Sequence, residues 1–434
     1  MARHVVAIVG GAVAGSEAAR LVAENGGIAV VFEQGARPYG KIEDGLPRWH
    51  DKLRLKEYER IDENLDDENI CFVPETGIGR DVSFEALRAL PFNAIILANG
   101  AWRDRPLPLP GVDDHVEKGL LYQNSLVQWF NHAHEADYEG PRYVIPPGAI
   151  VVGGGLASID VVKILSLVTH ADAIERAGHT PDLMAMEQKG IAAWCEREGI
   201  PLPEVELPTL YYRRSMEEMP LASPPANATP AQVEKIRGAR VKIMERVIDR
   251  YRVRFEGNHV PVAPLVEGGR LAGLVFRRTE GEGRDLHEVP GSEVEVRAPL
   301  VVSSIGSTPL PVTGIPMKGE LYDFADWDSG AMTGMDGVYG LGNVLTGKGN
   351  IKSSRENAEV VTAGLLDTYL SELDPIEEMH AAARERAKPV VAKALEGPPL
   401  HREERTPIRE LVHGRWKELG YDGYRAWAEA HRPG

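Results

Sequence analysis

The run Val5-Val6-Ala7-Ile8-Val9-Gly10-Gly11-Ala12-Val13-Ala14-Gly15 determines the type of fold. Its first five residues are apolar and mostly β-branched, which predicts a strand buried on both faces. The glycines predict a tight turn, and a helix is expected over residues 16–25. Residues 28–32 then read as a second strand. Strand, turn, helix and strand form the βαβ unit of an α/β fold with a parallel sheet.

The glycine turn also has the spacing of a dinucleotide-binding motif. Gly10 makes the tight turn, Gly15 lets helix and strand pack closely, and the helix N-terminus offers N–H groups to a pyrophosphate. Glu33 ends the second strand, where a carboxylate can accept hydrogen bonds from a ribose hydroxyl pair. The residues of the turn expected at the ligand are Gly10, Ala12, Val13, Ala14 and Gly15. Ala12 stands where the motif usually has its middle glycine, and an ordinary turn that binds nothing is the alternative interpretation.

The same pattern returns in the middle of the chain. Residues 149–152 read as a strand, residues 157–168 read as a helix, and Gly153-Gly154-Gly155-Leu156-Ala157-Ser158 lies between them. Two such motifs in one chain argue against coincidence and predict two nucleotides, usually a flavin and a nicotinamide. The residues expected at the second nucleotide are Gly153, Gly155, Leu156, Ala157 and Ser158.

A basic pair indicates which nicotinamide binds. Leu210-Tyr211-Tyr212 reads as a strand that ends in Arg213-Arg214. Guanidinium groups at a strand end suit the 2′-phosphate of NADPH, whereas an acidic residue there favours NADH. The alternative is a solvated basic pair on a loop.

Two more glycine clusters lie near the end of the α/β pattern. Gly340-Leu341-Gly342-Asn343 and Gly347-Lys348-Gly349-Asn350-Ile351-Lys352 precede a helix expected from about Ser353. Backbone N–H groups at a helix start would stabilise the negative charge of a reduced flavin. Either cluster could instead be a plain loop.

The composition limits the class of protein. The chain has 434 residues, which favours two domains, and no apolar run approaches the length of a membrane span. A cytoplasmic protein is therefore the expectation. A net charge of −16 disfavours nonspecific nucleic-acid or acidic-membrane binding. Only two cysteines occur, so a disulfide framework, a protein-borne iron–sulfur cluster and a Cys-x-x-Cys redox centre are not expected.

At this point the sequence resembles the adrenodoxin-reductase-like ferredoxin–NADP reductases, which are relatives of the glutamate synthase small subunit. The resemblance runs from Val5 to about Leu365. The residues that carry it are Gly10 to Gly15, Glu33, Pro38-Tyr39-Gly40, Asn99-Gly100, Gly153 to Ser158, Arg213-Arg214 and Gly342 to Ile351. Asn343 departs from it, because relatives have a tryptophan or an aspartate at this position.

The resemblance implies an α/β fold of two Rossmann-like dinucleotide-binding domains, with an NADP domain inserted into an FAD domain. It places FAD on residues 1–105 and 330–370, and NADPH on residues 106–329. The NADP domain carries a helical insertion over residues 171–208, and residues 371–434 form a helical extension. The implied FAD contacts include Gly40, Asn99, Gly100, Gly342, Asn343, Gly349, Asn350 and Ile351. His50 corresponds to a family histidine close to flavin and nicotinamide, where it could relay a proton or orient the nicotinamide.

The function that this resemblance implies is hydride transfer from NADPH to FAD, followed by electron delivery to an iron–sulfur carrier such as ferredoxin. Lys41 to Asp44 read Lys-Ile-Glu-Asp, which is expected to place acidic residues near the flavin. Three alternatives stay open: an electron-input subunit of a larger complex, a nucleotide-binding protein without turnover, and a flavin monooxygenase or oxidase.

Overall fold

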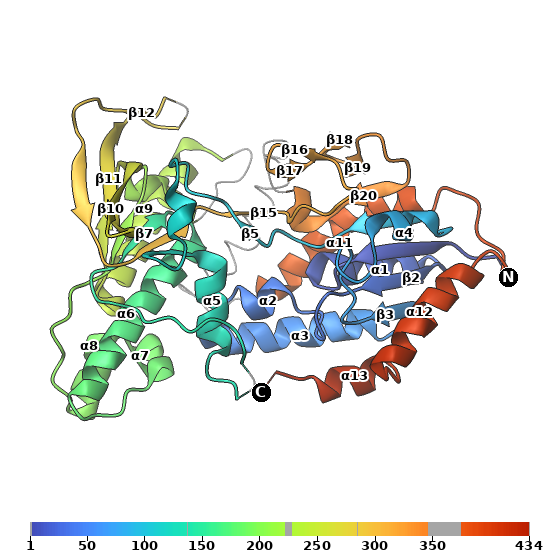
Figure 1. Cartoon of the computed structure of the whole chain (residues 1–434), viewed down its shortest axis with the longest axis horizontal. Coiled ribbons are helices and arrows are strands. Elements are labelled where there is room, and N and C mark those ends of the chain that lie inside the picture. Colours follow the sequence, from blue (N-terminus) through green and yellow to red (C-terminus); the bar gives the residue numbers. More distant parts are fainter. Residues whose placement is uncertain (1, 137, 222–227, 284, 346–374, 434) are drawn as a thin grey trace.

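The computed structural model describes residues 2–136, 138–221, 228–283, 285–345 and 375–433. Figure 1 shows two sheets in separate halves of an elongated molecule, with β5 and β15 running between them. The first sheet has seven strands in the order β18-β19-β20-β4-β1-β2-β3, and the second has five in the order β6-β14-β7-β8-β9. None of the helices in the described ranges is both long and apolar enough to cross a lipid bilayer.

The first sheet is parallel except at one edge. β18 and β19 are the antiparallel edge strands, and the other neighbours run parallel. The strands, in chain order, are β1 (Val5–Val9), β2 (Ile28–Phe32), β3 (Ile70–Val73), β4 (Ala94–Leu97), β18 (Phe324–Asp326), β19 (Ala331–Met332) and β20 (Val338–Gly340). β4 and β20 are paired neighbours although some 240 residues separate them in the sequence, because the second domain is inserted between them.

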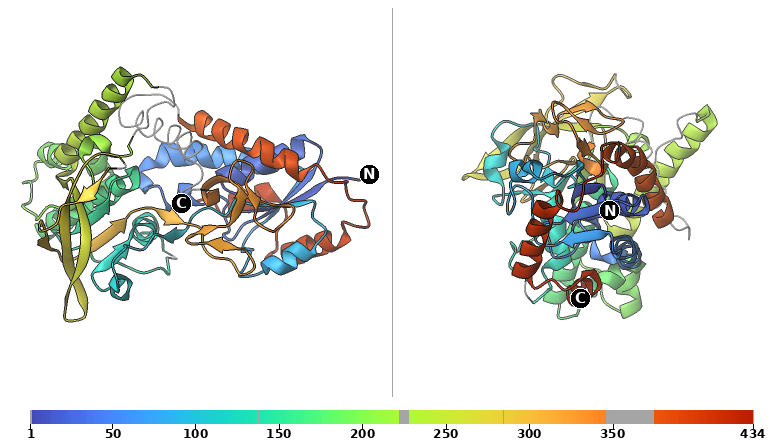
Figure 2. Two further views of the ribbon diagram at one scale, coloured as in Figure 1. Left: turned by 90° about the horizontal axis from the view of Figure 1, so that it is seen from above. Right: turned by 90° about the vertical axis from the view of Figure 1, so that its right-hand side faces the viewer.

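Strand periodicity explains why this sheet is covered on both faces. Val6 and Ile8 of β1 pack into one apolar cluster, while Val5, Ala7 and Val9 pack into another on the opposite face. The helices that provide the two covers are α1 (Val13–Glu24), α3 (Asp51–Leu65), α4 (Phe84–Ala89), α11 (Pro375–Ala394), α12 (Thr406–Leu419) and α13 (Tyr424–Ala430). The first cluster includes residues of α1, α3, α11 and α13, and the second includes residues of α4 and α12. Figure 2 shows α11 lying along the helices of the amino-terminal segment.

The second sheet is covered by helices on one face and by an antiparallel layer on the other. Its strands are β6 (Leu120–Tyr122), β7 (Ile150–Gly153), β8 (Thr209–Tyr211), β9 (Arg254–Glu256) and β14 (Val301–Ser304). Its helices are α5 (Gln123–His132), α6 (Leu156–Arg176), α7 (Leu183–Lys189), α8 (Ile191–Glu198) and α9 (Pro230–Tyr251). The antiparallel strands are β10 (His259–Glu267), β11 (Arg270–Glu280), β12 (His287–Glu288) and β13 (Val294–Arg297). Leu271, Leu274 and Phe276 of β11 pack in one cluster with Ile150 and Val152 of β7.

The expected fold class, an α/β fold with one sheet unit inserted into the other, is confirmed by this topology. The two crossings between the units lie side by side, since β5 (Arg103–Asp104) pairs with β15 (Ser307–Thr308) in antiparallel register. The short remaining elements are α2 (Lys41–Asp44), η1 (Arg48–His50), η2 (Val112–His115), η3 (Met216–Glu218), β16 (Met317–Lys318), β17 (Leu321–Tyr322) and η4 (Gly342–Leu345).

Candidate functional site

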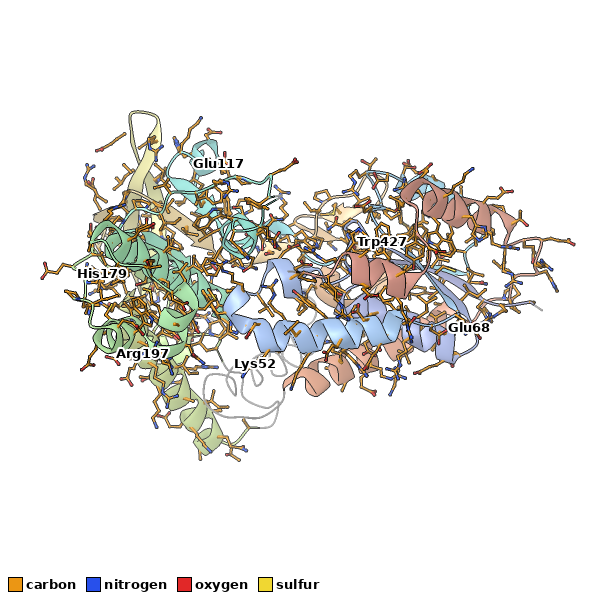
Figure 3. All side chains as sticks on the ribbon, turned by 90° about the horizontal axis from the view of Figure 1, so that it is seen from below. Lys52, Glu68, Glu117, His179, Arg197 and Trp427 are labelled. Carbon is orange, nitrogen blue, oxygen red and sulfur yellow. The ribbon has the colours of Figure 1, made fainter. Side chains whose placement is uncertain are left out.

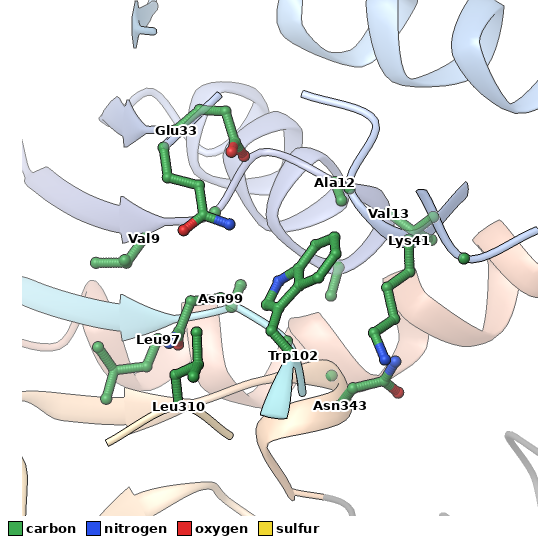
Figure 4. A pocket seen from close by; sticks show the side chains of 18 of the residues that line it. Val9, Ala12, Val13, Glu33, Lys41, Leu97, Asn99, Trp102, Leu310 and Asn343 are labelled. Atoms are coloured by element: carbon green, nitrogen blue, oxygen red, sulfur yellow. The ribbon is translucent and has the colours of Figure 1, made fainter. Parts of the chain in front are cut away.

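A cavity of about 770 Å³ lies at the carboxyl ends of the strands of the first sheet and reaches the inserted domain. Many of the residues predicted from sequence line it. They are Gly10, Ala12, Val13, Ala14, Glu33, Gly40, Asn99, Gly100, Leu156, Ala157, Gly342 and Asn343. Figure 4 shows Glu33 and Lys41 on opposite sides of the Trp102 ring within this cavity. Because Leu156 and Ala157 belong to the inserted unit, a ligand that fills the cavity would contact both halves of the molecule.

The first glycine turn brings the amino end of α1 to the cavity wall. Gly10 has φ +97°, a conformation that side chains with a Cβ rarely adopt. A Cβ at Gly15 would lie 1.8 Å from the Gly10 carbonyl oxygen, so this residue sets the close contact between helix and strand rather than lining the cavity. No side chain caps the N-terminus of α1, whereas Thr229 caps α9 and Asp182 caps α7. The N–H groups of this helix are thus available to an anionic ligand.

Glu33 is held at the end of β2 by backbone donors. The Gly11 N–H donates to Oε2 at 2.8 Å and the Gly35 N–H donates to Oε1 at 3.1 Å. Burial raises the pKa of Glu33, and the hydrogen bonds from Gly11 and Gly35 oppose that rise. Each carboxylate oxygen keeps a lone pair for a further donor, as a ribose hydroxyl pair would require.

Asn99 presents an unsatisfied acceptor at the cavity. Its Nδ2 donates to the Tyr322 hydroxyl at 3.0 Å, while its Oδ1 is buried without a hydrogen-bond partner. Because an unpaired buried acceptor is costly, this atom fits a polar group of a bound ligand. Gly342 packs closely on α1, since a Cβ there would lie 2.8 Å from the Ala14 Cβ, and the adjacent Asn343 lines the cavity.

The expectation that Lys41 to Asp44 place acidic residues near the flavin stays a prediction, although neither acid lines the cavity. Glu43 forms an ion pair with Arg37, and Asp44 Oδ1 lies 3.0 Å from His132 Nε2. Of the four residues, Lys41 and Ile42 line the cavity. The single turn of α2 thus brings Lys41 and Ile42 to the cavity wall, while Asp44 stays near enough to Glu33 to contribute to the raised pKa of that carboxyl.

His50 is buried at the border between the two domains but is not among the residues that line the cavity. The Trp49 indole N–H donates to His50 Nε2 at 3.0 Å, and Asp160 Oδ1 lies 3.7 Å from the same nitrogen. Asp160 does line the cavity. Lys163 lies with its ammonium 4.5 Å from the Trp49 ring centroid and pairs with Glu187 at 2.7 Å. The His50 ring is therefore held by a hydrogen bond from its neighbour Trp49, with Asp160 of the inserted domain close to the same nitrogen.

The second glycine turn connects β7 to α6 and also lacks a side-chain cap. Ser158 Oγ donates to the Ser304 carbonyl at 3.0 Å, which ties α6 to the end of β14. A Cβ at Gly153 would lie 2.2 Å from Ser158 Oγ, while a Cβ at Gly155 would meet nothing within 4 Å. Gly155 is thus open to a ligand, and Gly153 is a packing contact.

Arg213 and Arg214 follow β8 at the same edge of the second sheet. Val152 pairs with Tyr211 in parallel register, so β7 and β8 end at the same edge of the sheet. The arginines after β8 therefore lie near the second glycine turn, which follows β7. Arg213 is exposed, and Arg214 Nη2 donates to the Gly283 carbonyl at 2.8 Å. Arg214 Nε is buried without a hydrogen-bond partner. Both guanidinium groups can donate hydrogen bonds to an anionic group at this edge of the sheet.

The structure adds cavity residues that the sequence analysis did not identify. They are contributed by segments remote from the glycine motifs: Thr76–Arg80, Trp102, Gln123, Asn124, Leu310–Thr313, Ile315, Ala383 and Arg386. Ala383 and Arg386 belong to α11, so the carboxyl-terminal extension helps to enclose the cavity. No local motif marks these residues, because they reach the cavity only through the packing of the whole chain. Gly349, Asn350, Ile351 and the helix expected from Ser353 lie outside the described residues.

The cavity fits an extended dinucleotide with a flavin ring. It combines an uncapped helix N-terminus for pyrophosphate, a fixed carboxylate for ribose and an unsatisfied Asn99 oxygen in one continuous space. The second turn offers an uncapped N-terminus beside two arginines, which fits a phosphate-bearing nucleotide.

Comparison with known sequences supports this interpretation of the fold. Residues 4–200 match the pyridine nucleotide-disulphide oxidoreductase family. The chain is 29% identical over 313 residues to the NADPH-Fe(3+) oxidoreductase subunit beta of Geobacter sulfurreducens, a match that covers 70% of this chain and 37% of that subunit. It is 27% identical to the NADPH-ferredoxin reductase FprA of Mycobacterium tuberculosis, over 79% of this chain and 76% of FprA.

Comparison with solved structures gives the same fold. FprA from Mycobacterium tuberculosis in complex with NADPH superposes with a TM-score of 0.66 at 19% sequence identity. The superposition covers 96% of this chain and 91% of FprA. The arrangement of two sheets described above is therefore that of a known two-domain architecture.

Proposed function

We propose that this chain, whose residues 4–200 match the pyridine nucleotide-disulphide oxidoreductase family, is an FAD-dependent NADPH oxidoreductase that passes electrons to an iron–sulfur carrier protein. The observation that carries the proposal is the single cavity that begins at Glu33 in the first domain and ends at Leu156, Ala157 and Asp160 in the second. Such a cavity places a ligand of the first domain against the nucleotide-binding turn of the second. The names of the NADPH-ferredoxin and NADPH-Fe(3+) reductases support the same class of reaction.

FAD would be held by the first domain. The N–H groups at the start of α1 would bind its pyrophosphate, and Glu33 would accept hydrogen bonds from its ribose hydroxyls. The Asn99 oxygen and the Gly342–Asn343 turn would contact the remainder of the molecule. Gly349, Asn350 and Ile351 would also contact FAD, as their glycine-rich sequence pattern indicates. The FAD domain would comprise residues 1–105 and 330–370, with residues 371–434 as an extension.

NADPH would bind the inserted domain, residues 106–329. Gly155, Leu156 and Ala157 would receive its pyrophosphate, and Arg213 with Arg214 would bind the 2′-phosphate. Ser158 would act indirectly by fixing the first turn of α6 on Ser304.

His50 would orient the nicotinamide end of NADPH. With the Trp49 N–H donating to Nε2, the favoured neutral tautomer carries its proton on Nδ1. Asp160 lies close to Nε2 and lines the cavity, so it marks the place where the ligand would come nearest to His50. When bound, FAD supplies the acceptor for the hydride of NADPH and releases electrons to a one-electron carrier.

The electrons would leave the chain for a separate protein. Cys71 lies in β3 and Cys195 in α8, and both are free. Burial raises the pKa of Cys71 to about 11, so its thiolate is scarce at neutral pH. A dithiol relay within the chain is thus not part of the proposal.

An anaerobic visible spectrum of the purified protein tests the proposal. Flavin bands that bleach faster with NADPH than with NADH, followed by reduction of an added ferredoxin, are the expected result. Faster bleaching by NADH would contradict the role of Arg213 and Arg214. A colourless protein that FAD cannot reconstitute would contradict the proposal as a whole.

A second candidate is an electron-input subunit of a larger complex. One relative is itself a subunit, and the present chain spans 37% of its length. Size-exclusion chromatography of a native extract separates the candidates, because a subunit co-elutes with a large partner and an independent reductase does not.

A further inference from the structure

Lys41 occupies the point where three parts of the chain meet at the cavity. It is the first residue of α2 in the first domain. Its Nζ donates to Asn124 Oδ1 in α5 of the inserted domain and to Ser307 Oγ in the returning crossing β15, both at 3.1 Å. The ammonium also lies 5.7 Å from the centroid of the Trp102 ring. Lys41 is therefore at the end of the cavity that faces the inserted domain.

No carboxylate neutralises this ammonium directly. Among the described residues, none has a carboxylate oxygen within ion-pair distance of Lys41 Nζ; the two short contacts are to neutral groups. Asp104 is the acid that influences Lys41 electrostatically, but its carboxylate accepts the Asn124 N–H at 3.2 Å and does not line the cavity. A ligand in the cavity would thus lie against the lysine and not against Asp104.

The other charged side chains of the lining lie on different elements. The cations are Arg80 and Arg386, and the acids are Glu33, Glu57 and Asp160. Arg80 pairs with Asp81, and Glu33 is bound by backbone N–H groups. Burial lowers the pKa of Lys41 to about 8, against the attraction of Asp104, and burial raises the pKa of Asp104 to about 6. Near pH 7 Lys41 is therefore mainly a charged, poorly solvated cation.

We propose that Lys41 stabilises the reduced state of the bound flavin and so raises its midpoint potential. This inference rests on the proposed function, because it requires FAD in the cavity. A hydride carries two electrons and one proton, so a flavin that accepts it and takes no second proton gains one negative charge. In a cavity of low polarity, a nearby cation favours that charged state much more than it does in water.

The competing interpretation is that Lys41 only holds the two domains together, through its hydrogen bonds to Asn124 and Ser307. Two substitutions distinguish the interpretations. Lys41→Gln removes the charge but keeps an amide donor, and Lys41→Arg keeps the charge with a different donor geometry. If the charge of Lys41 matters, Lys41→Gln and Lys41→Met should have the same lowered midpoint potential. If only the hydrogen bonds between the domains matter, Lys41→Gln should have the midpoint potential of the wild type.

The experiment is an equilibrium redox titration of the FAD-loaded protein at pH 7 against dyes of known potential. We expect Lys41→Gln and Lys41→Met to weaken the binding of reduced flavin relative to oxidised flavin by about tenfold. This change lowers the midpoint potential by about 30 mV for a two-electron couple. Lys41→Arg should stay near the wild-type value. Lys52→Met is the matched control, because Lys52 is exposed at the start of α3 and points away from the domain (Figure 3).

The pH dependence provides a second readout. Lys41 is charged below its pKa, so the difference between wild type and Lys41→Gln should be present at pH 7 and disappear as the pH rises towards 10. Lys41 lowers the pKa of Asp104, so this carboxyl ionises at a higher pH in Lys41→Gln than in the wild type. The later ionisation raises the potential of the variant near neutral pH, so it opposes the expected difference and does not produce it.

The outcomes separate this inference from the proposed function. Unchanged potentials in FAD-loaded Lys41→Gln and Lys41→Met would overturn the inference and leave the reductase intact. A potential that is lowered in Lys41→Met but not in Lys41→Gln would indicate that Lys41 acts through its hydrogen bonds and not through its charge, and would also overturn the inference. A wild-type protein that binds no FAD would overturn the proposed function, and the inference with it.

Discussion

The two glycine turns of this chain share a pattern but differ in their surroundings. The turn before α1 is enclosed, with Gly40, Gly342, Trp102 and α11 around the same cavity. At the turn before α6, the described residues that line the cavity are Leu156, Ala157 and Asp160, all in α6. Arg213, at the same edge of the second sheet, is exposed. A nucleotide in the first turn would be retained by protein on several sides, while one in the second could exchange with solvent. The difference teaches that a similar local motif can serve a resident cofactor or a substrate, depending on what the rest of the chain places over it.

Adding one methyl group to each turn tests the difference between the two turns most directly. In Gly15→Ala the new Cβ would lie 1.8 Å from the Gly10 carbonyl oxygen, so α1 must move. We expect a loss of roughly 4 kcal/mol of folding stability and loss of bound flavin. Gly155→Ala should keep both, because its Cβ meets nothing within 4 Å. Urea unfolding and the flavin-to-protein ratio measure the two effects, and a Gly15→Ala protein with full flavin content would contradict the expectation.

A second prediction concerns the cover that α11 provides for the first turn. His380 contacts Glu17 Oε1 at 2.8 Å and Glu57 Oε2 at 2.9 Å, and all three residues are buried. Burial alone would lower the pKa of His380, but the hydrogen bonds and charges of the two glutamates outweigh it and raise the pKa. We expect His380→Asn to destabilise the protein by about 3 kcal/mol at pH 6, because it removes the cation that bridges two buried carboxylates and leaves only the more distant arginines near them.

The pH dependence of this effect has a defined sign. A histidine whose pKa is raised on folding contributes stability that is complete below its ordinary value of 6.5 and is lost as the pH rises through the folded-state pKa. The stability difference between wild type and His380→Asn should therefore be smaller at pH 9 than at pH 6. Arg60 and Arg384, which lie near Glu17, remain charged across this range and do not reverse the trend. A difference that grows with pH would contradict the imidazolium assignment.

Removing the arginines sharpens the comparison at the exposed turn. We expect the double substitution Arg213→Ala, Arg214→Ala to cost about 2 kcal/mol in NADPH binding, or roughly thirtyfold in affinity. NADH binding and flavin content should change little, because the groups contact a phosphate that NADH lacks. Arg270→Ala, at an exposed site on β11, is the control. An equal loss for NADH and NADPH would show that the pair does not recognise the 2′-phosphate.

The smallest effect is expected at Ser158, which stands at the position of Gly15 in the second turn. Ser158→Ala removes the hydrogen bond to the Ser304 carbonyl and should weaken NADPH binding or stability by about 1 kcal/mol. Isothermal titration with NADP⁺ and urea unfolding measure these quantities. A loss as large as that in Gly15→Ala would show that the two turns are equally constrained.

The local units of the fold could be predicted from the sequence. Val5–Val9 and Ile28–Phe32 are strands, and Glu33 stands at the end of the second, because apolar runs and glycine turns act over a few residues. The helix expected at residues 16–25 begins instead at Val13, and the one expected at residues 157–168 extends to Arg176. These differences are at element boundaries, where periodicity gives the least information.

The parts that escaped prediction depend on long-range packing. The antiparallel strands β10–β13 pack against one face of the second sheet, and no single sequence motif predicts this packing. Lys41 lines the cavity and donates to Asn124 of α5, a residue 83 positions further along the chain. Leu310, Pro311 and Arg386 join the cavity from segments hundreds of residues beyond the first turn. Such contacts follow from the assembled chain and not from local sequence.

The paired crossings β5 and β15 have a consequence for how such a protein can be rearranged. Asp104 and Ser307 are partners across two short strands, so the whole inserted unit enters and leaves the first domain at one place. A unit whose ends are adjacent can be removed, replaced or transplanted as a cassette without displacing the strands on either side. The cofactor-bearing half could in this way exchange one nucleotide specificity for another while its own architecture stays the same.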